Sequence, residues 1–198
     1  MAVKIHPTAD VSDKAKLGDG TSVWHQAQIR ENAVLGEKCN IGKGAYVDFG
    51  VHLGNGVKLQ NYVNVYHGVT LEDYVFVGPS ATFTNDMYPR AAVWSDDLVV
   101  KTLVKKGASI GANSTIRCGI TIGEYATIGA GAVVTRDVPD HALAYGSPAR
   151  IHGFVCECGF PAEKKELTGR GMEGAVVMKC TKCGKEFEVP YPVYRKME

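Results

Sequence analysis

The chain of 198 residues has no excess of charge of either sign and no long apolar run. It carries 22 Lys and Arg against 21 Asp and Glu, a formal net charge of +1, so no broad basic surface is expected for nucleic acid or membrane lipid. No apolar stretch approaches the roughly 20 residues of a membrane-spanning helix, and no signal-peptide pattern is present. The sequence therefore predicts a cytoplasmic protein with no nucleic-acid partner and no membrane partner.

The chain also lacks the periods of an amphipathic helix or an alternating strand, and large apolar residues recur instead every six positions. A period of six fits a solenoid in which each hexad is a short strand plus a turn, and three hexads make one triangular coil. The periodic residues are Ile5, Val11, Leu17, Val23, Ile29, Leu35, Ile41, Val47, Leu53, Leu59, Val65, Leu71, Val77 and Phe83, then Val104, Ile110, Ile116, Ile122, Ile128 and Val134.

A small or β-branched residue follows each large one after four positions, for example Ala27 after Val23 and Val63 after Leu59. A triangular prism has room for one large and one small side chain per face. The 23 glycines suit the sharp corners between faces, where positive φ is often required. This pattern resembles that of the hexapeptide-repeat proteins and predicts an all-β fold, a left-handed parallel β-helix.

The repeat is interrupted once. Val104 follows Phe83 by 21 positions rather than 18, so residues 84–103 cannot continue the coil and form an inserted loop. A loop of this length in a compact repeat protein is more often functional than idle, although a tolerated surface insertion is the alternative. Pro139 and Pro148 mark the end of the repeat. We therefore predict a β-helix domain over residues 1–153, with its last coil ending near residue 140.

Residues 154–198 differ in composition and carry four cysteines, in the patterns C-x-C-G and C-x-x-C-G, with 21 residues between the second and third cysteines. They are Cys156, Cys158, Cys180 and Cys183. Four thiolates can close a tetrahedral site for a structural Zn²⁺, and a cytosolic setting favours metal over disulfides. We predict a zinc-ribbon-like segment with strands at 175–179 and 186–189. Its first cysteine pair is one residue shorter than the usual C-x-x-C, and redox-active or unpaired thiols are the alternative.

Residues 18 apart should stack on successive coils, about 4.8 Å from one another. His67 should therefore lie directly below Asn85, the second residue of the inserted loop, and Tyr66 should lie below Thr84. Polar and aromatic side chains thus gather where the loop leaves the coil. Small-molecule sites typically have this mixture of a shaped wall and a few directed polar groups.

Two stretches carry a family resemblance. Residues 65–91, with GPS at 78–80 and FTNDMYPRA at 83–91, resemble nucleotide-sugar N-acetyltransferases, which acetylate the 3-amino group of UDP- or dTDP-linked sugars. Residues 128–150 resemble the terminal coils of hexapeptide acyltransferases in general. The resemblance covers residues 1–153 and implies a homotrimer that uses acetyl-CoA, in cell-surface polysaccharide biosynthesis. The cysteine-bearing tail is similar to that of some UDP-3-amino-uronate acetyltransferases, which makes such a uronate the first candidate substrate.

The resemblance also implies roles for residues near the loop. Asn85 occupies the motif position near the reacting amine, where it would orient the amine or polarise the thioester. His67 is the nearest imidazole and is suited to base work near neutral pH, with substrate contact or simple packing as alternatives. Residues expected to contact the nucleotide sugar are Tyr66, Glu72, Thr84, Asp86 and Arg90. Residues expected to contact CoA are Gly111, Ala112, Gly129, Ala130, Thr135, Arg136 and Arg150.

Other functions fit less well. The runner-up enzyme is an acetyltransferase for a dTDP-3-amino-6-deoxyhexose. A non-catalytic trimeric scaffold would leave the long loop and the acyltransferase-like terminal coils unexplained. A γ-type carbonic anhydrase shares this solenoid but needs two histidines five residues apart on one strand, and no pair among the histidines here has that spacing.

Overall fold

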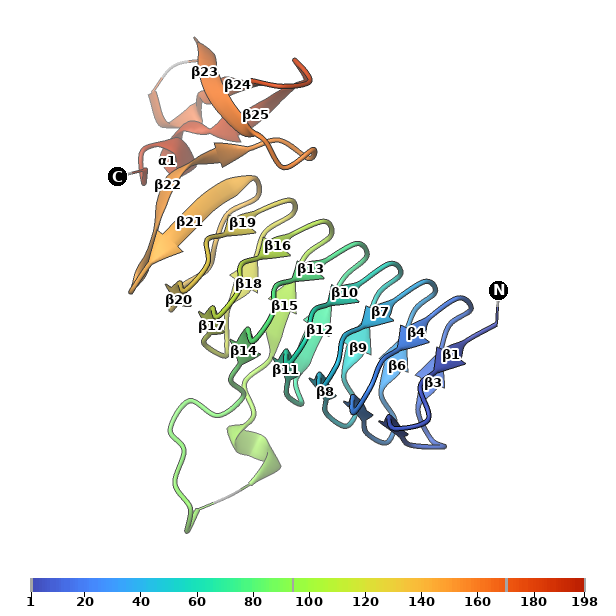
Figure 1. Ribbon diagram of the computed structural model, residues 1–198. Coiled ribbons are helices and arrows are strands. Elements are labelled where there is room, and N and C mark those ends of the chain that lie inside the picture. Colours follow the sequence, from blue (N-terminus) through green and yellow to red (C-terminus); the bar gives the residue numbers. More distant parts are fainter. Residues whose placement is uncertain (1, 94, 170, 198) are drawn as a thin grey trace.

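The computed structural model describes residues 2–93, 95–169 and 171–197, and its chain winds into a three-sided coil (Figure 1). Most hexads contribute a strand of two residues. Each strand pairs in parallel with the strand one coil further on, as in Val47 with Val65 and Leu59 with Val77. The predicted parallel β-helix is confirmed, with the inferred spacing of 18 residues per coil.

The strands form three sheets, one for each face of the prism. Face A contains β1 (Lys4–Ile5), β4 (Ser22–Val23), β7 (Asn40–Ile41), β10 (Lys58–Leu59), β13 (Phe76–Val77), β16 (Ser109–Ile110) and β19 (Thr127–Ile128). Face B contains β2 (Asp10–Val11), β5 (Gln28–Ile29), β8 (Tyr46–Val47), β11 (Asn64–Val65), β14 (Thr82–Phe83), β17 (Thr115–Ile116) and β20 (Val133–Val134). Face C contains β3 (Lys16–Leu17), β6 (Val34–Leu35), β9 (His52–Leu53), β12 (Val69–Leu71), β15 (Thr102–Val104) and β18 (Thr121–Ile122).

The interior of the prism is filled by the periodic residues. From β4 onward, the last residue of each coil strand is buried. The small residue four positions later is also buried, as for Val23 and Ala27, except after Phe83, where the arm begins. Ile5 of the first coil is 49% exposed because no coil lies beneath it. The alternation of large and small side chains is therefore a packing requirement of the narrow core.

Glycines serve two different purposes at the corners. A Cβ on Gly111 would lie 2.4 Å from the backbone nitrogen of Ala130, and one on Gly129 would lie 2.6 Å from Cβ of Tyr145. These glycines, which directly follow the strands, allow successive coils to approach closely. Positive φ is needed further along the corner, at residues such as Asn32 (φ 59°) and Gly44 (φ 63°).

The C-terminal segment extends face A instead of standing apart from it. β21 (Ala142–Gly146) pairs in parallel with β19, and four antiparallel strands then continue the sheet: β22 (Ala149–Val155), β23 (Pro161–Thr168), β24 (Ala175–Cys180) and β25 (Glu186–Pro190). The two strands predicted around the second cysteine pair are confirmed as β24 and β25. Strand β22 runs across the predicted boundary at residues 153 and 154. Phe154, Val176 and Val189 belong to the same apolar core as the coil. We call residues 154–197 the cap.

The inserted loop leaves the corner between faces B and C and projects from the prism as an arm (Figure 1). The coil stops at Phe83 and resumes at Thr102. Isolated bridges pair Asp86 with Val99 and Arg90 with Val93, so the two sides of the arm run antiparallel. The interruption predicted from the broken period is confirmed, and the base of the arm lies beside His67.

Helices are short in the described part of the chain. They are the 3₁₀ turns η1 (Asp96–Leu98) in the arm and η2 (Gly171–Glu173) in the cap, and the helix α1 (Tyr191–Tyr194). Within residues 2–93, 95–169 and 171–197, no helix has the length and apolar character needed to cross a bilayer.

Candidate active site

The corner between faces B and C brings together several of the predicted residues. The rings of Phe49 and His67 stack with centroids 4.1 Å apart and planes within 12°. Phe49 and His67 occupy equivalent positions in successive coils, so the 18-residue repeat itself stacks them along one edge. Asn85 follows β14 at the base of the arm, where its backbone carbonyl accepts a hydrogen bond from the N–H of Val100 (2.9 Å).

The imidazole of His67 is held in one tautomer. Its Nδ1 lies 2.9 Å from the carbonyl oxygen of Phe49. A carbonyl oxygen can only accept a hydrogen bond, so Nδ1 carries the proton and donates. The lone pair of the neutral ring is then on Nε2, the atom free to accept a proton. The stack on Phe49 fixes the plane of the ring, and the side chain is half-buried.

A buried carboxylate holds this corner together. Asp48 is 5% exposed. Its Oδ1 accepts hydrogen bonds from the Tyr46 hydroxyl (2.9 Å), Nη1 of Arg30 (3.0 Å) and the backbone N–H of Phe49 (2.8 Å). Its Oδ2 accepts from the backbone N–H of His67 (3.1 Å). Asp48 thus joins three successive coils and fixes both residues of the stacked pair.

The charges around Asp48 are stable near neutral pH. Hydrogen bonds to Tyr46 and to Glu31 raise the pKa of the Arg30 guanidinium. Burial raises the pKa of the Tyr46 hydroxyl, which therefore stays protonated and donates to Asp48. A hydrogen bond from its own backbone and another from Arg30 lower the pKa of the Glu31 carboxyl. Asp48 and Arg30 precede Tyr66 by 18 and 36 residues, in the same ladder, but nothing in the sequence pattern marked Asp48 as the centre of this network.

The predicted substrate residues of the arm differ in their surroundings. Thr84 Oγ1 accepts a hydrogen bond from the backbone N–H of Cys118 (3.0 Å), and Asp86 Oδ1 accepts one from that of Tyr88 (2.7 Å). The half-buried Asn85 has a side-chain amide without a hydrogen-bond partner among the described residues. Arg90 is exposed on the arm, where its Nη1 donates to the carbonyl of Pro89 (2.9 Å), and it forms no ion pair within the described residues.

Two further predicted residues occupy the coil itself. Tyr66 is 38% exposed, and its ring packs at a tilt on Tyr46, with centroids 5.5 Å apart. Glu72 lies at the corner between faces C and A, where its Oε2 accepts a hydrogen bond from the backbone N–H of Lys106 (2.9 Å). Glu72 therefore stands on a different edge of the prism from His67.

A pocket of about 340 Å³ lies between the coil and the base of the arm. His67 and Thr70 line it from the coil, and Asp96, Val99 and Lys101 line it from the arm. Asp96 and Lys101 were not among the predicted site residues. A larger hollow of about 630 Å³ lies between the coil and the cap. The smaller pocket contains the oriented imidazole, and we therefore take it as the candidate active site.

The residues predicted to contact CoA lie on two different edges of one chain. Gly111, Ala112, Gly129 and Ala130 follow strands of face A, at the corner between faces A and B. Thr135 and the exposed Arg136 follow β20, at the same corner as His67 but further along the coil. Arg150 lies in β22, where its Nη1 donates to the carbonyl of Ala149.

Another exposed cation at the His67 corner was missed by the sequence reasoning. Arg117 follows β17, and neither Arg117 nor Arg136 has a charged or hydrogen-bonded partner among the described residues. The sequence could have indicated Arg117, because it occupies the position equivalent to Thr84 in the next coil.

The four cysteines of the cap meet, as predicted. Their sulfur atoms all lie within 4.8 Å of one another. Hydrogen bonds from the backbone N–H groups of Cys183 and Lys182 lower the pKa of Cys180 to about 6, whereas burial raises the pKa of Cys156 to about 12. This cluster lies at the end of the solenoid, and the arm leaves the prism several coils away (Figure 1).

Comparisons with known proteins agree with the fold. The family model "Bacterial transferase hexapeptide (six repeats)" matches residues 50–85 and 101–136, and "Hexapeptide repeat of succinyl-transferase" matches residues 32–67. Among solved structures, the acetyltransferase domain of PglB from Neisseria gonorrhoeae, in complex with acetyl coenzyme A, has a TM-score of 0.51 at 27% identity. That match covers 75% of this chain and 57% of the other.

Two other proteins extend the comparison. The LpxA acyltransferase of Bacteroides fragilis shares the fold, with a TM-score of 0.63 at 18% identity over 77% of this chain and 61% of its own. The dTDP-3-amino-3,6-dideoxy-alpha-D-galactopyranose 3-N-acetyltransferase of Aneurinibacillus thermoaerophilus is 53% identical over 154 residues, which is 78% of this chain and 79% of that protein. Identity at this level over most of both chains places the protein among the hexapeptide-repeat acyltransferases, as an acetyltransferase.

Proposed function

We propose that the protein transfers the acetyl group of acetyl-CoA to the 3-amino group of a nucleotide-linked amino sugar. The observation that carries the chemistry is the hydrogen bond from His67 Nδ1 to the Phe49 carbonyl. It leaves Nε2 as an oriented proton acceptor beside a pocket of suitable size. The relative with 53% identity supports the class of acceptor.

His67 acts as the general base in this proposal. The neutral sugar amine attacks the thioester carbonyl and forms a tetrahedral adduct that carries the amine's extra proton. Nε2 of His67 accepts that proton. As the adduct collapses to the amide, the C–S bond breaks and the protonated His67 gives the proton to the sulfur, so CoA leaves as the thiol and the imidazole is neutral again. Because a neutral amine is already a good nucleophile, alignment in the pocket supplies a large part of the rate.

Asn85 is the proposed partner of the oxyanion or the amine. Its side-chain amide is free to bond to a ligand, and its backbone carbonyl accepts from the N–H of Val100 (2.9 Å), which holds the residue at the base of the arm. An amide N–H aimed at a developing oxyanion stabilises the tetrahedral adduct. Tyr66, Thr84 and Arg90 then serve as candidate contacts for the nucleotide sugar.

The separation of the predicted CoA residues supports a homotrimer. The A–B edge and the B–C edge of one prism are separated by the whole of face B, so one chain does not place Gly111 and Gly129 beside His67. Packing the A–B edge of one copy beside the B–C edge of another would bring Gly111 and Gly129 opposite His67. We propose that each active site lies between two copies in this way.

The most specific part of the proposal is which nucleotide the amino sugar carries. The cysteine-bearing tail put a UDP-3-amino-uronate first, whereas the relative with 53% identity is named for a dTDP-3-amino-3,6-dideoxyhexose. We propose the dTDP-linked sugar as the first substrate to test, with the uronate second. Both would be modified in the cytoplasm, where acetyl-CoA and nucleotide sugars are available, before use in a cell-surface polysaccharide.

The test measures CoA release with dTDP-3-amino, dTDP-4-amino and UDP-3-amino-uronate sugars as acceptors. CoA is quantified by chromatography, because exposed thiols of the protein itself would react with a thiol reagent. We expect turnover with the dTDP-3-amino sugar and a large loss of kcat in His67→Ala. Turnover with the uronate alone would reverse the order of the two substrates. No turnover with any of these sugars would reject this acceptor class. A pH profile of His67→Ala equal to that of the wild type would reject His67 as the general base.

A further inference from the structure

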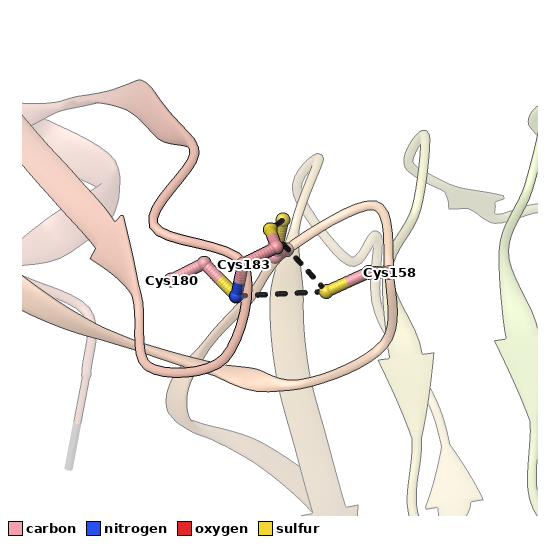
Figure 2. Close-up of side chains that lie close together, drawn as sticks. Cys158, Cys180 and Cys183 are labelled. Atoms are coloured by element: carbon pink, nitrogen blue, oxygen red, sulfur yellow. Dashed lines mark hydrogen bonds between the residues drawn. The ribbon is translucent and has the colours of Figure 1, made fainter.

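The geometry of the cysteine cluster suits a metal ion better than disulfides. Sγ of Cys158 lies 3.5 Å from that of Cys180 and 3.7 Å from that of Cys183, and Sγ of Cys156 lies 3.7 Å from that of Cys183. A disulfide needs about 2.05 Å, and here one sulfur is nearly equidistant from two others. Zn–S bonds of about 2.3 Å in a tetrahedron place sulfurs about 3.8 Å apart. Figure 2 shows three of these side chains converging from two facing loops.

The loops that carry the cysteines have the turns that such a site requires. In the second loop, Cys180 Sγ accepts backbone N–H groups from Lys182 (3.4 Å) and Cys183 (3.5 Å), and Gly184 adopts a positive φ of 73°. In the shorter first loop, the N–H of Gly159 bonds to the carbonyl of Cys156 at 2.8 Å, and Gly159 has φ 84°. The turn from Cys156 to Gly159 therefore brings Cys156 and Cys158 together, although their C-x-C spacing is one residue shorter than C-x-x-C.

Contacts of two lysine side chains join the two cysteine loops. Lys185 of the second loop pairs with Glu157 of the first at 2.6 Å. Lys182 lies over the ring of Phe160, 3.9 Å from its centroid. Both lysines thus reach across from one cysteine loop to the other.

The first cysteine loop is attached to the last coil through His141. Its ring stacks on Tyr125 of the coil, with centroids 5.4 Å apart, and on Phe187 of β25, at 4.3 Å. Its Nδ1 bonds to the carbonyl of Val155 at 3.0 Å, and the N–H of Val155 bonds back to the carbonyl of His141 at 2.8 Å. Val155 directly precedes Cys156, so the cysteine cluster and the coil share one anchored segment.

We propose that Cys156, Cys158, Cys180 and Cys183 bind one Zn²⁺, and that this ion locks the cap onto the last coil. Four Zn–S bonds form as four S–H bonds break, and the protons go to solvent. The ion ties the segment that follows β22 to the turn between β24 and β25. It does not take part in acetyl transfer, because the cluster and the His67 pocket lie in different parts of the solenoid.

The first experiment asks whether the metal is there. Elemental analysis of the purified full chain should find about one zinc per chain, and replacement by Co²⁺ should give the thiolate charge-transfer and tetrahedral d–d absorption bands of a four-sulfur site. Cys158→Ser should lose the metal, whereas Cys39→Ala, which removes a buried thiol of the coil core, should retain it. A chain without zinc that gives no such cobalt bands would overturn the site.

The second experiment asks whether the ion locks the cap, using the wild-type chain so that no variant has to fold. Hydrogen exchange would be followed before and after zinc is removed by a chelator. We expect exchange in 175–180 and 186–190 to quicken at least tenfold while strands β10 and β13 keep their protection. Unchanged cap exchange after complete metal loss would overturn the locking role. Neither experiment depends on the acetyl acceptor, so failure here leaves the proposed enzymatic function standing.

Discussion

Oδ2 of Asp48 accepts a hydrogen bond from the backbone N–H of His67, at 3.1 Å and one coil away. Oδ1 of the same carboxylate holds the N–H of Phe49, whose carbonyl fixes the His67 ring. One buried acid therefore determines the position of the proposed base without touching its ring. Asp48 is a positioning residue in this account.

Asp48→Asn should lower kcat by about tenfold with little change in KM, because it loses the ionic bond to Arg30 and one of its oxygen acceptors. Steady-state kinetics with the accepted sugar will measure this. Asp10→Asn is the matched control, since Asp10 also bonds across one coil, to Gln28 (2.8 Å), but on the exposed surface. Equal kinetics for Asp48→Asn and wild type would show that the network is not needed to hold His67.

Asn85→Ala should reduce turnover at least tenfold while the proposed trimer still forms, because the proposed amide donor is lost but the backbone bond to Val100 remains. Kinetics and light scattering on the same samples will separate catalysis from assembly. Thr115→Ala is the control and should behave as wild type, because Thr115 lies on face B, one coil beyond β14. A wild-type rate in Asn85→Ala would remove Asn85 from the mechanism.

Gly111→Ala should destabilise the chain by about 1–3 kcal/mol, because the new Cβ would meet the backbone of Ala130 at 2.4 Å. Thermal denaturation will measure the loss. Gly131→Ala isolates the other cost of replacing a corner glycine: Gly131 has φ 71° with no atom within 4 Å of an added Cβ, so its loss should be about 1–2 kcal/mol from backbone strain alone. No change in Gly111→Ala would mean that the coils can move apart there.

Arg136→Gln should raise KM for acetyl-CoA several-fold and leave kcat nearly unchanged, because in the proposed site the exposed guanidinium would contact a phosphate rather than the reacting atoms. The effect should shrink as salt is added, since a surface ionic contact is screened. Lys58→Gln, an exposed cation on face A, is the control. An equal KM in both variants would exclude Arg136 from the CoA site, and Arg117→Gln would then be the next variant to measure.

The coil was predictable because it depends only on the repeat. Strand residues 18 apart pair on the same face wherever the coil is uninterrupted, as for Val47 with Val65 and Leu59 with Val77. The role of Asp48 was not predictable, because it depends on which side chains turn inward at a corner. The course of the arm was not predictable either, since residues 84–103 follow no period. The continuity of β22 with the coil was hidden by a change in composition that marks the cysteine loops and not a break in the sheet.

The antiparallel strands that continue face A also determine how such a chain can change in length. β22 reverses direction against β21, so no further parallel rung can be added after it, whereas every strand from β4 to β17 has a parallel neighbour on both sides. Gain or loss of a whole 18-residue coil below the arm would leave the arm, the cysteine cluster and their spacing untouched. A coil gained or lost between them would change the distance from pocket to cap by one rung, about 4.8 Å.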